Sequence, residues 1–119
     1  MNDNAKELVA VLESGEFEQG TNCLSRHDKH CCLGVACLVY QKRVGGLDIS
    51  LDPSSERVSY DGTRVVMPNV VRNYFGFQTT TGLFHIDSSW NSLAGLNDSG
   101  KSFKEIAAVI KSEPQGLFV

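Results

Sequence analysis

A ten-residue apolar run, residues 31–40 (CCLGVACLVY), limits the folds open to this chain more than any other feature. The run carries no charge and holds three of the four cysteines. Drawn as a helix, it is apolar on two faces, and such a helix is buried on nearly every side. Lys42 and Arg43 follow it, where cations suit a helix C-terminus, and Gly34 within it indicates close backbone packing. We therefore predict a buried central helix with Asp28 as its N-cap.

Further helices are predicted from capping residues and apolar spacing. Asn4 with Glu7, and Ser102 with Glu105, have the form of a capping box that precedes an apolar series. A brief helix that carries Trp90 is also expected from the spacing of its apolar residues. The expected helices begin near Asn4, Pro68, Ser88 or Ser89, and Ser102.

Strand signals lie between these helices. Residues 47–51 alternate between apolar and polar side chains, and residues 83–86 predict a further short strand. Residues 56–67 contain Asp61-Gly62 between two β-prone runs, which is typical of a two-residue hairpin turn. The expected fold is therefore α+β: a single compact domain over residues 1–119, in which the buried central helix packs with a small antiparallel sheet and short flanking helices.

Charge and hydropathy narrow the function classes. The chain has 119 residues, with 11 basic and 14 acidic side chains and a net charge of −3. Surfaces that bind nucleic acid usually carry clustered Lys and Arg, so a nucleic-acid partner is not expected. No apolar run approaches the roughly 18 residues that span a bilayer, and the first residues lack the pattern of a secretory signal. We expect a cytoplasmic protein that keeps its cysteines as free thiols.

Several blocks of the sequence carry a resemblance to known proteins. They are residues 12–20 (LESGEFEQG), 31–37 (CCLGVAC), 67–71 (MPNVV), 92–100 (SLAGLNDSG) and 102–107 (SFKEIA). In these blocks and their order, the chain resembles a family of short, mostly uncharacterised proteins of tailed bacteriophages and prophages. The resemblance implies a phage origin and a place of action in the cytoplasm of an infected bacterium. It implies no established activity.

A zinc site is one chemical alternative. Thiolates and imidazoles are the ligands that Zn²⁺ prefers, and four such groups fall close together in the sequence: Cys23, His27, His30 and Cys31. They lack the two separated ligand pairs that usually close a structural zinc site. The competing interpretation treats the cysteines as small apolar core residues and the histidines as solvated loop residues.

A thiol hydrolase is a second alternative. Cys31 stands at the start of the predicted central helix, where the helix dipole favours a thiolate. His85 and Asp87 follow in the chain and would serve as base and as the group that orients it. No local signature surrounds these residues, and a single His on an apolar strand is more often a packed side chain.

A ligand that contains phosphate is a third alternative. Cations are spread along the chain without a glycine-rich phosphate loop, and aromatic residues lie among them. The candidate ligand-binding residues are Arg26, Lys29, Arg64, Arg72, Tyr74 and Trp90. The sequence does not place these side chains together, and the competing interpretation treats them as ordinary surface residues.

The function expected from this combination is binding rather than catalysis. We expect a phage accessory protein, an anti-defence inhibitor that blocks a host bacterial protein or sequesters a small nucleotide-type ligand. A small thiol- or zinc-dependent hydrolase is the alternative. No cofactor is expected, and the sequence leaves homodimerisation open.

Overall fold

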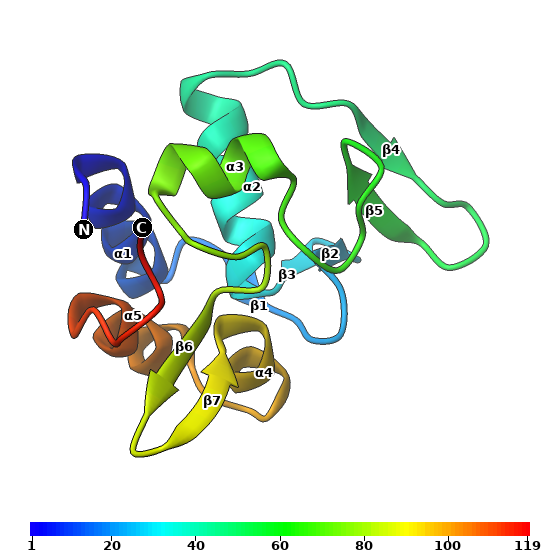
Figure 1. Ribbon diagram of the computed structural model, residues 1–119. Helices are drawn as coiled ribbons and strands as arrows, with labels where there is room; N and C mark the ends of the chain where they lie inside the picture. Colours follow the sequence, from blue (N-terminus) through cyan, green and yellow to red (C-terminus); the bar gives the residue numbers. More distant parts are fainter.

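The computed structural model describes residues 1–119, which form five helices and two sheets (Figure 1). The helices are α1 (Asp3–Ser14), α2 (Cys32–Arg43), α3 (Asn69–Phe75), α4 (Leu93–Asp98) and α5 (Phe103–Lys111). The strands are β1 (Glu18–Gln19), β2 (Ser25–Arg26), β3 (Lys29–His30), β4 (Ile49–Leu51), β5 (Arg57–Tyr60), β6 (Leu83–Ile86) and β7 (Ser89–Ser92). The α+β class predicted from the sequence is confirmed. None of the helices has the length and apolar character needed to cross a bilayer.

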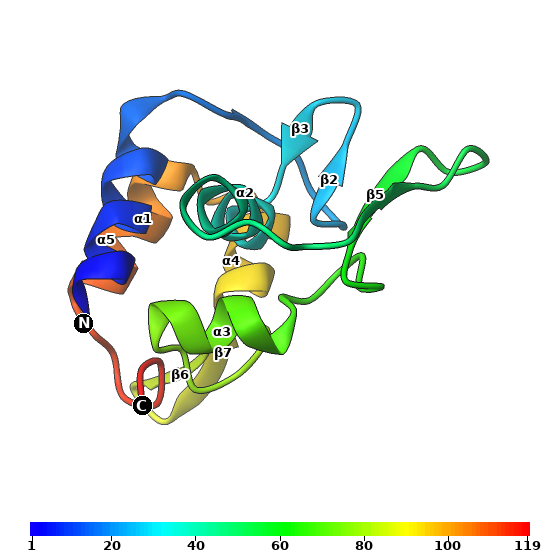
Figure 2. The ribbon, with the colours of Figure 1, turned by 90° about the horizontal axis from the view of Figure 1, so that it is seen from above.

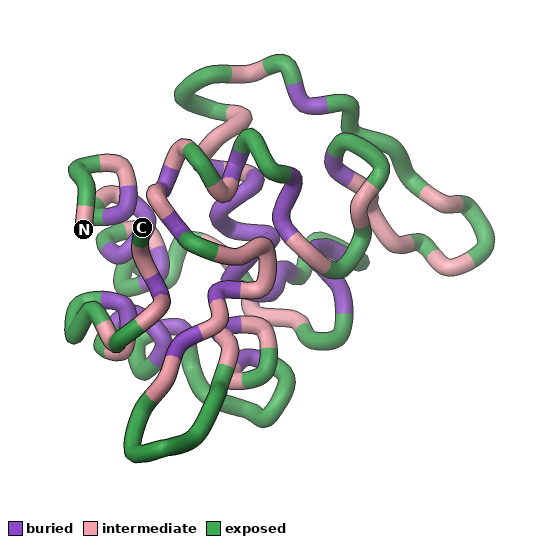
Figure 3. Tube along the Cα trace, viewed as in Figure 1, coloured by how far each residue is buried: buried purple, intermediate pink, exposed green.

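Helix α2 occupies the centre of the molecule, as the apolar run predicted. Its neighbours are α1, α3 and α4, and Figure 2, which looks nearly down the axis of α2, shows other elements on most sides of it. Figure 3 shows that burial is concentrated around this helix. The buried residues of α2 are Cys32, Leu33, Gly34, Val35, Ala36, Cys37 and Val39. The cysteine-rich run is therefore the core of the fold.

The larger sheet has five short strands in the order β1-β3-β2-β5-β4. β1 pairs with β3 in parallel, and the remaining pairs are antiparallel. The smaller sheet is the β6–β7 hairpin. The larger sheet approaches α2 closely at Gly34, where an added Cβ atom would lie 1.9 Å from the carbonyl oxygen of Leu24. Only glycine permits this contact between the helix and Leu24, the residue before β2.

Asn97 connects three segments that lie far apart in the sequence. The side chain is fully buried at the C-terminal end of α4. Its Oδ1 accepts hydrogen bonds from the backbone N–H of Cys32, at 3.1 Å, and from Nε2 of Gln19, at 2.9 Å. Its Nδ2 donates to the carbonyl oxygen of Gly20, at 2.8 Å. One amide thus holds α4, the start of α2 and the β1 segment together.

The caps of the first two helices differ from the sequence prediction. Asn2, not Asn4, caps α1 and accepts a hydrogen bond from the N–H of Ala5 at 2.8 Å. Cys31, not Asp28, caps α2. Asp28 instead forms a tight turn with His27, and both have positive φ angles, 61° and 52°. The polar stretch before α2 is therefore a β2–β3 hairpin rather than a cap.

The predicted hairpin at residues 56–67 forms only in part. Asp61 and Gly62 adopt the expected turn, with φ angles of 51° and 83°, but only one bridge, between Tyr60 and Thr63, follows it. The strands that pair with β5 are β2 and β4. Beyond Thr63 the chain leaves β5, because the carbonyl of Arg64 accepts a hydrogen bond from the N–H of Leu24 instead. Tertiary pairing thus outweighs the local turn signal.

The predicted start of the brief helix that carries Trp90 is also wrong, because the helix begins after Trp90. Residues Ser89–Ser92 form strand β7, which pairs with β6 after a two-residue turn at Asp87 and Ser88. Ser92 is the N-cap of α4, and its Oγ accepts a hydrogen bond from the N–H of Gly95. Apolar spacing did not distinguish the strand from the helix in so short a segment. By contrast, the capping box between Ser102 and Glu105 at the start of α5 is confirmed.

Substitution Gly34→Ala should destabilise the fold severely. The new methyl group would displace the Leu24 backbone, and overpacking of a core costs about 3 kcal/mol or more where backbone must move. Urea unfolding measures the loss. Gly95→Ala in α4 is the matched control: this helical glycine is exposed, and its new Cβ would meet only Ser92 Oγ, at 3.0 Å, so the change should stay within about 1 kcal/mol. Equal stability of the Gly34→Ala protein and the wild type would contradict the close packing described.

Candidate functional site

The cysteines are inside the protein. All four, Cys23, Cys31, Cys32 and Cys37, are buried and none forms a disulfide. Burial raises the pKa of Cys32 well above its ordinary value and has the same effect on the pKa of Cys37. A thiol acts as a nucleophile only as the thiolate. These side chains therefore pack as small apolar groups.

Cys31 does not have the character of a reactive thiol. It is 4% exposed, and its Sγ accepts a hydrogen bond from the N–H of Gly34 at 3.4 Å. Burial raises the pKa of Cys31 to about 11, although the hydrogen bond from Gly34 acts in the opposite direction. Desolvation thus outweighs the effect of the helix N-terminus, and the thiolate expected from the sequence is disfavoured.

The other two residues of the predicted triad lie in the β6–β7 hairpin. His85 is half-buried on β6, and its ring packs against the ring of Trp90 with centroids 4.9 Å apart. Asp87 is exposed in the turn that follows. No hydrogen bond joins Cys31, His85 and Asp87 to one another. The structure does not assemble the three into a catalytic arrangement.

The candidate zinc ligands are also separated by their own contacts. His30 Nδ1 lies 2.6 Å from Ser25 Oγ, which in turn lies 2.8 Å from the hydroxyl of Tyr60. His27 Nδ1 lies 2.8 Å from a carboxylate oxygen of Glu56. Cys31 is occupied as the cap of α2. No group of three or more His, Cys, Asp or Glu side chains is arranged to hold a metal ion. Cys23, His27, His30 and Cys31 are thus neighbours in sequence without being a set of ligands.

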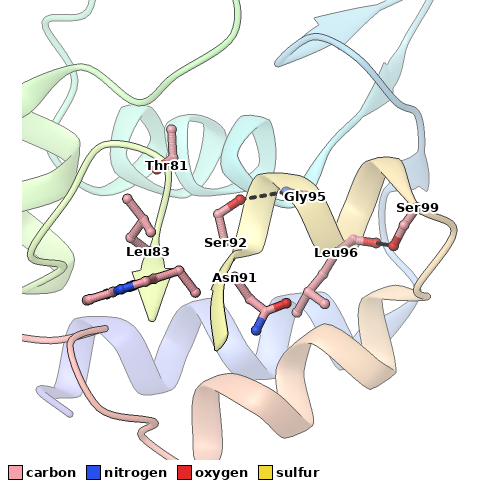
Figure 4. Close-up of a pocket in the computed structure, with 8 residues that line it drawn as sticks. Thr81, Leu83, Asn91, Ser92, Gly95, Leu96 and Ser99 are labelled. Atoms are coloured by element: carbon pink, nitrogen blue, oxygen red, sulfur yellow. Dashed lines mark hydrogen bonds between the residues drawn. The ribbon is translucent and has the colours of Figure 1, made fainter. Parts of the chain in front are cut away.

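Two surface hollows contain candidate ligand-binding residues. The first, here called the Trp90 hollow, has a volume of about 530 Å³ and lies where the β6–β7 hairpin meets α4 (Figure 4). Trp90 is 67% exposed beside it. Its lining residues are Thr81, Leu83, Trp90, Asn91, Ser92, Gly95, Leu96 and Ser99. An exposed tryptophan beside a hollow of mixed apolar and polar lining is a feature of contact surfaces.

The second hollow, here called the basic hollow, has a volume of about 310 Å³ and lies beside the β2–β3 hairpin. It brings Arg26 and Lys29 together, two of the cations that the sequence singled out. Its lining residues are Gln19, Gly20, Thr21, Cys23, Arg26, His27 and Lys29. Trp90 is not among them, so these cations and that ring belong to different surfaces.

The remaining predicted ligand residues have other surroundings. Arg64 Nη1 lies 3.4 Å from a carboxylate oxygen of Asp52. Arg72 donates to the carbonyl of Phe77 at 3.3 Å. Tyr74 packs edge-on against Tyr40. The six residues predicted to bind a ligand therefore do not form one site.

The sequence did not indicate that Arg57 lies beside Arg26. This side chain stands on β5 directly opposite Arg26, and its position depends on a strand pairing between residues more than 30 apart in sequence. No local pattern reveals that pairing.

The structure is a small α+β domain with buried thiols and hollows on its surface. The chain belongs to the family described as Domain of unknown function (DUF8296), whose model matches residues 1–114. No curated protein and no solved structure matches the chain.

The buried thiols should resist modification in the native protein. In a Cys23→Ser background, which leaves Cys31, Cys32 and Cys37, an aromatic disulfide reagent should react slowly in buffer and with all three thiols in urea. Burial and the raised pKa values are the physical reason. Absorbance of the released chromophore measures the rate. Reaction of Cys31 in the native state at the rate of a free cysteine would restore the hydrolase interpretation.

Stability should fall on mild acidification because of His30. Burial lowers the pKa of His30 below 6.5, and the neighbouring Asp28 only partly offsets this effect. The unfolded chain therefore takes up this proton more readily than the folded protein, so stability is full above about pH 6.5 and declines as the pH falls below that value. Urea midpoints between pH 7.5 and 5.5 measure the decline. His30→Gln should flatten it and the control His85→Gln should not; an unchanged slope in His30→Gln would refute the assignment.

Proposed function

We propose that this chain acts by binding, as a phage accessory protein that inhibits a protein of the bacterial host. The single observation that carries the proposal is Trp90, a large aromatic side chain that is 67% exposed on a short, supported hairpin. Tryptophan is among the residues most enriched where partners bind tightly. The phage origin and the cytoplasmic location are supported by the sequence resemblance, and the anti-defence role is part of the proposal itself.

The hairpin that carries Trp90 is anchored at several points. Four consecutive residue pairs join β6 to β7. Beyond the hairpin, the N–H of His85 donates to the carbonyl of Gln115 at 2.8 Å, which ties β6 to the C-terminal segment. The ring of Trp90 rests against the ring of His85. A partner therefore meets a pre-organised aromatic surface, which lowers the entropic cost of association.

Burial of the thiols favours binding over catalysis. The hydrolase alternative needs a reactive Cys31 or a set of zinc ligands, and the side chains proposed for each have the separate contacts described above. The Trp90 hollow needs no reactive group to act, since it supplies apolar area beside polar rim residues. Interfaces commonly combine these two elements.

Trp90→Ala should remove partner binding without unfolding the domain. Truncation of an aromatic residue at the centre of an interface costs about 2 kcal/mol or more of binding free energy, which raises the dissociation constant about thirtyfold. Tagged wild-type and variant chains are used as baits in the bacterial host, and mass spectrometry identifies the proteins retained. The purified partner is then titrated with the chain while the partner's activity is measured.

The matched control is Leu51→Ala. Leu51 is an apolar residue of similar exposure, 62%, on β4 of the other sheet. The proposal expects a host protein that the wild type and Leu51→Ala bind and Trp90→Ala does not, with inhibition complete at a stoichiometric ratio. A bound protein that Trp90→Ala retains with equal affinity would contradict the role of this surface. Inhibition at far less than stoichiometric amounts would indicate catalysis instead.

A further inference from the structure

Three cations stand in one row across the larger sheet. Arg26 on β2 pairs directly with Lys29 on β3 and with Arg57 on β5. Residues that face each other across neighbouring strands project from the same side of a sheet, and adjacent strands are about 4.8 Å apart. We call Lys29, Arg26 and Arg57 the cationic row. It crosses the middle of the sheet, where Figure 2 shows β3, β2 and β5 in succession beside α2.

The cationic row lies on the outer side of the sheet. The next residue pairs along the same strands are Ser25 with His30 and Ser25 with Val58. Ser25 and His30 are buried, and Ser25 contacts the buried Tyr60. Because side chains alternate along a strand, the cationic row projects away from this buried side. Arg26 and Lys29 are exposed accordingly, and Arg57 is half-exposed.

Only one cation of the row, Lys29 at its end, is paired with an acidic side chain. Arg26 and Arg57 form no ion pair. Lys29 Nζ lies 3.8 Å from Glu18 Oε1 at the margin of the sheet, and both side chains are more than half exposed. Like charges directly opposite each other in a sheet are destabilising, and here three occur in succession in a chain of net charge −3. A local arrangement that opposes folding often marks a functional surface.

The basic hollow adjoins the cationic row and gives it depth. Arg26 and Lys29 belong to the row and also line the hollow. His27 lines the hollow too, and its Nδ1 lies 2.8 Å from a carboxylate oxygen of Glu56. The hollow, at about 310 Å³, is in the range that small-molecule sites occupy, about 300–1,000 Å³. Its lining is mostly polar, so an anion rather than an apolar ligand suits it. Arg and Lys side chains at this spacing match an anion with several charged oxygens.

We propose that the basic hollow and the cationic row form a binding site for a small ligand with several phosphate groups. Arg26 stands at the centre of the site and contacts the ligand together with Lys29, while Arg57 extends the positive surface across β5. The site is separate from the Trp90 hollow and does not depend on the protein-binding role proposed above. Nucleoside polyphosphates and inorganic polyphosphate share the chemistry that the site recognises.

Calorimetric titration with sodium tripolyphosphate tests the site, and ATP is the second probe. The wild type should bind tripolyphosphate with an affinity that weakens as sodium chloride is raised, because the contacts are ionic. The double variant Arg26→Gln, Lys29→Gln should weaken binding by about tenfold or more, as expected for the loss of charge-assisted hydrogen bonds. Tighter binding of ATP than of tripolyphosphate would show that a nucleoside is part of the ligand, and equal binding would show that phosphate groups suffice.

The matched control removes two other exposed lysines, in Lys42→Gln, Lys104→Gln, and so changes the net charge equally. This control should bind tripolyphosphate within about twofold of the wild type, since its positions lie outside the row. Thermal melting provides an independent readout. Without ligand, the Arg26→Gln, Lys29→Gln protein should melt at or above the wild-type temperature, because like charges have been removed.

Three results would overturn the proposal. One is the absence of tripolyphosphate binding by the folded wild type at low salt. A second is equal weakening of binding in both double variants, which would show that only net charge matters. A third is a ligand-free melting temperature of Arg26→Gln, Lys29→Gln well below that of the wild type, which would show that the row serves structure instead.

Discussion

The structure depends on one buried amide. Asn97 satisfies the N–H of Cys32 in the first turn of α2, where a helix has backbone donors without partners inside the helix. Buried polar groups are costly unless they are paired, so the contacts of Asn97 to Cys32, Gln19 and Gly20 require one another. The amide thereby fixes the start of α2, the β1 segment and the end of α4 in one arrangement. The sequence blocks 31–37 and 92–100 contain the two ends of its hydrogen bond to Cys32.

This arrangement explains why the cysteine-rich run is structural. With the start of α2 fixed beneath α4, Cys32 Sγ comes within 3.5 Å of the carbonyl of Leu93, and Cys31 turns its sulfur to cap the helix. Both thiols lose contact with solvent, and burial raises their pKa values. The exposed side chains that could bind a partner or ligand therefore come from the elements that surround α2. The β6–β7 hairpin presents an aromatic ring, and the outer side of the larger sheet presents cations.

Local patterns predicted the elements whose cause is local. The two-sided apolar run predicted α2, and the capping box at Ser102 predicted the start of α5, because each pattern needs only neighbours in sequence. The same reasoning failed where a distant segment decides the structure. The second strand of the 56–67 hairpin is missing because Arg64 bonds to Leu24, and Trp90 lies on a strand because β6 pairs with it. The cationic row shows the same difference between local and distant causes. Arg26 and Lys29 were predicted as ligand residues and lie opposite each other, whereas Arg57 joins them only through the pairing of β5 with β2.

The exchange rate of the Cys32 amide hydrogen tests the role of Asn97 most directly. If Asn97 holds these three segments together, the Cys32 amide exchanges only when the whole domain unfolds. Its opening free energy, measured by native-state exchange followed by NMR, then equals the free energy of global unfolding. The amides of Val35 and Cys37, inside α2, supply that reference in the same experiment. Equal protection of all three amides is the predicted result. Rapid exchange at Cys32 while Val35 and Cys37 stay protected would show that the start of α2 opens on its own, and that Asn97 does not hold it.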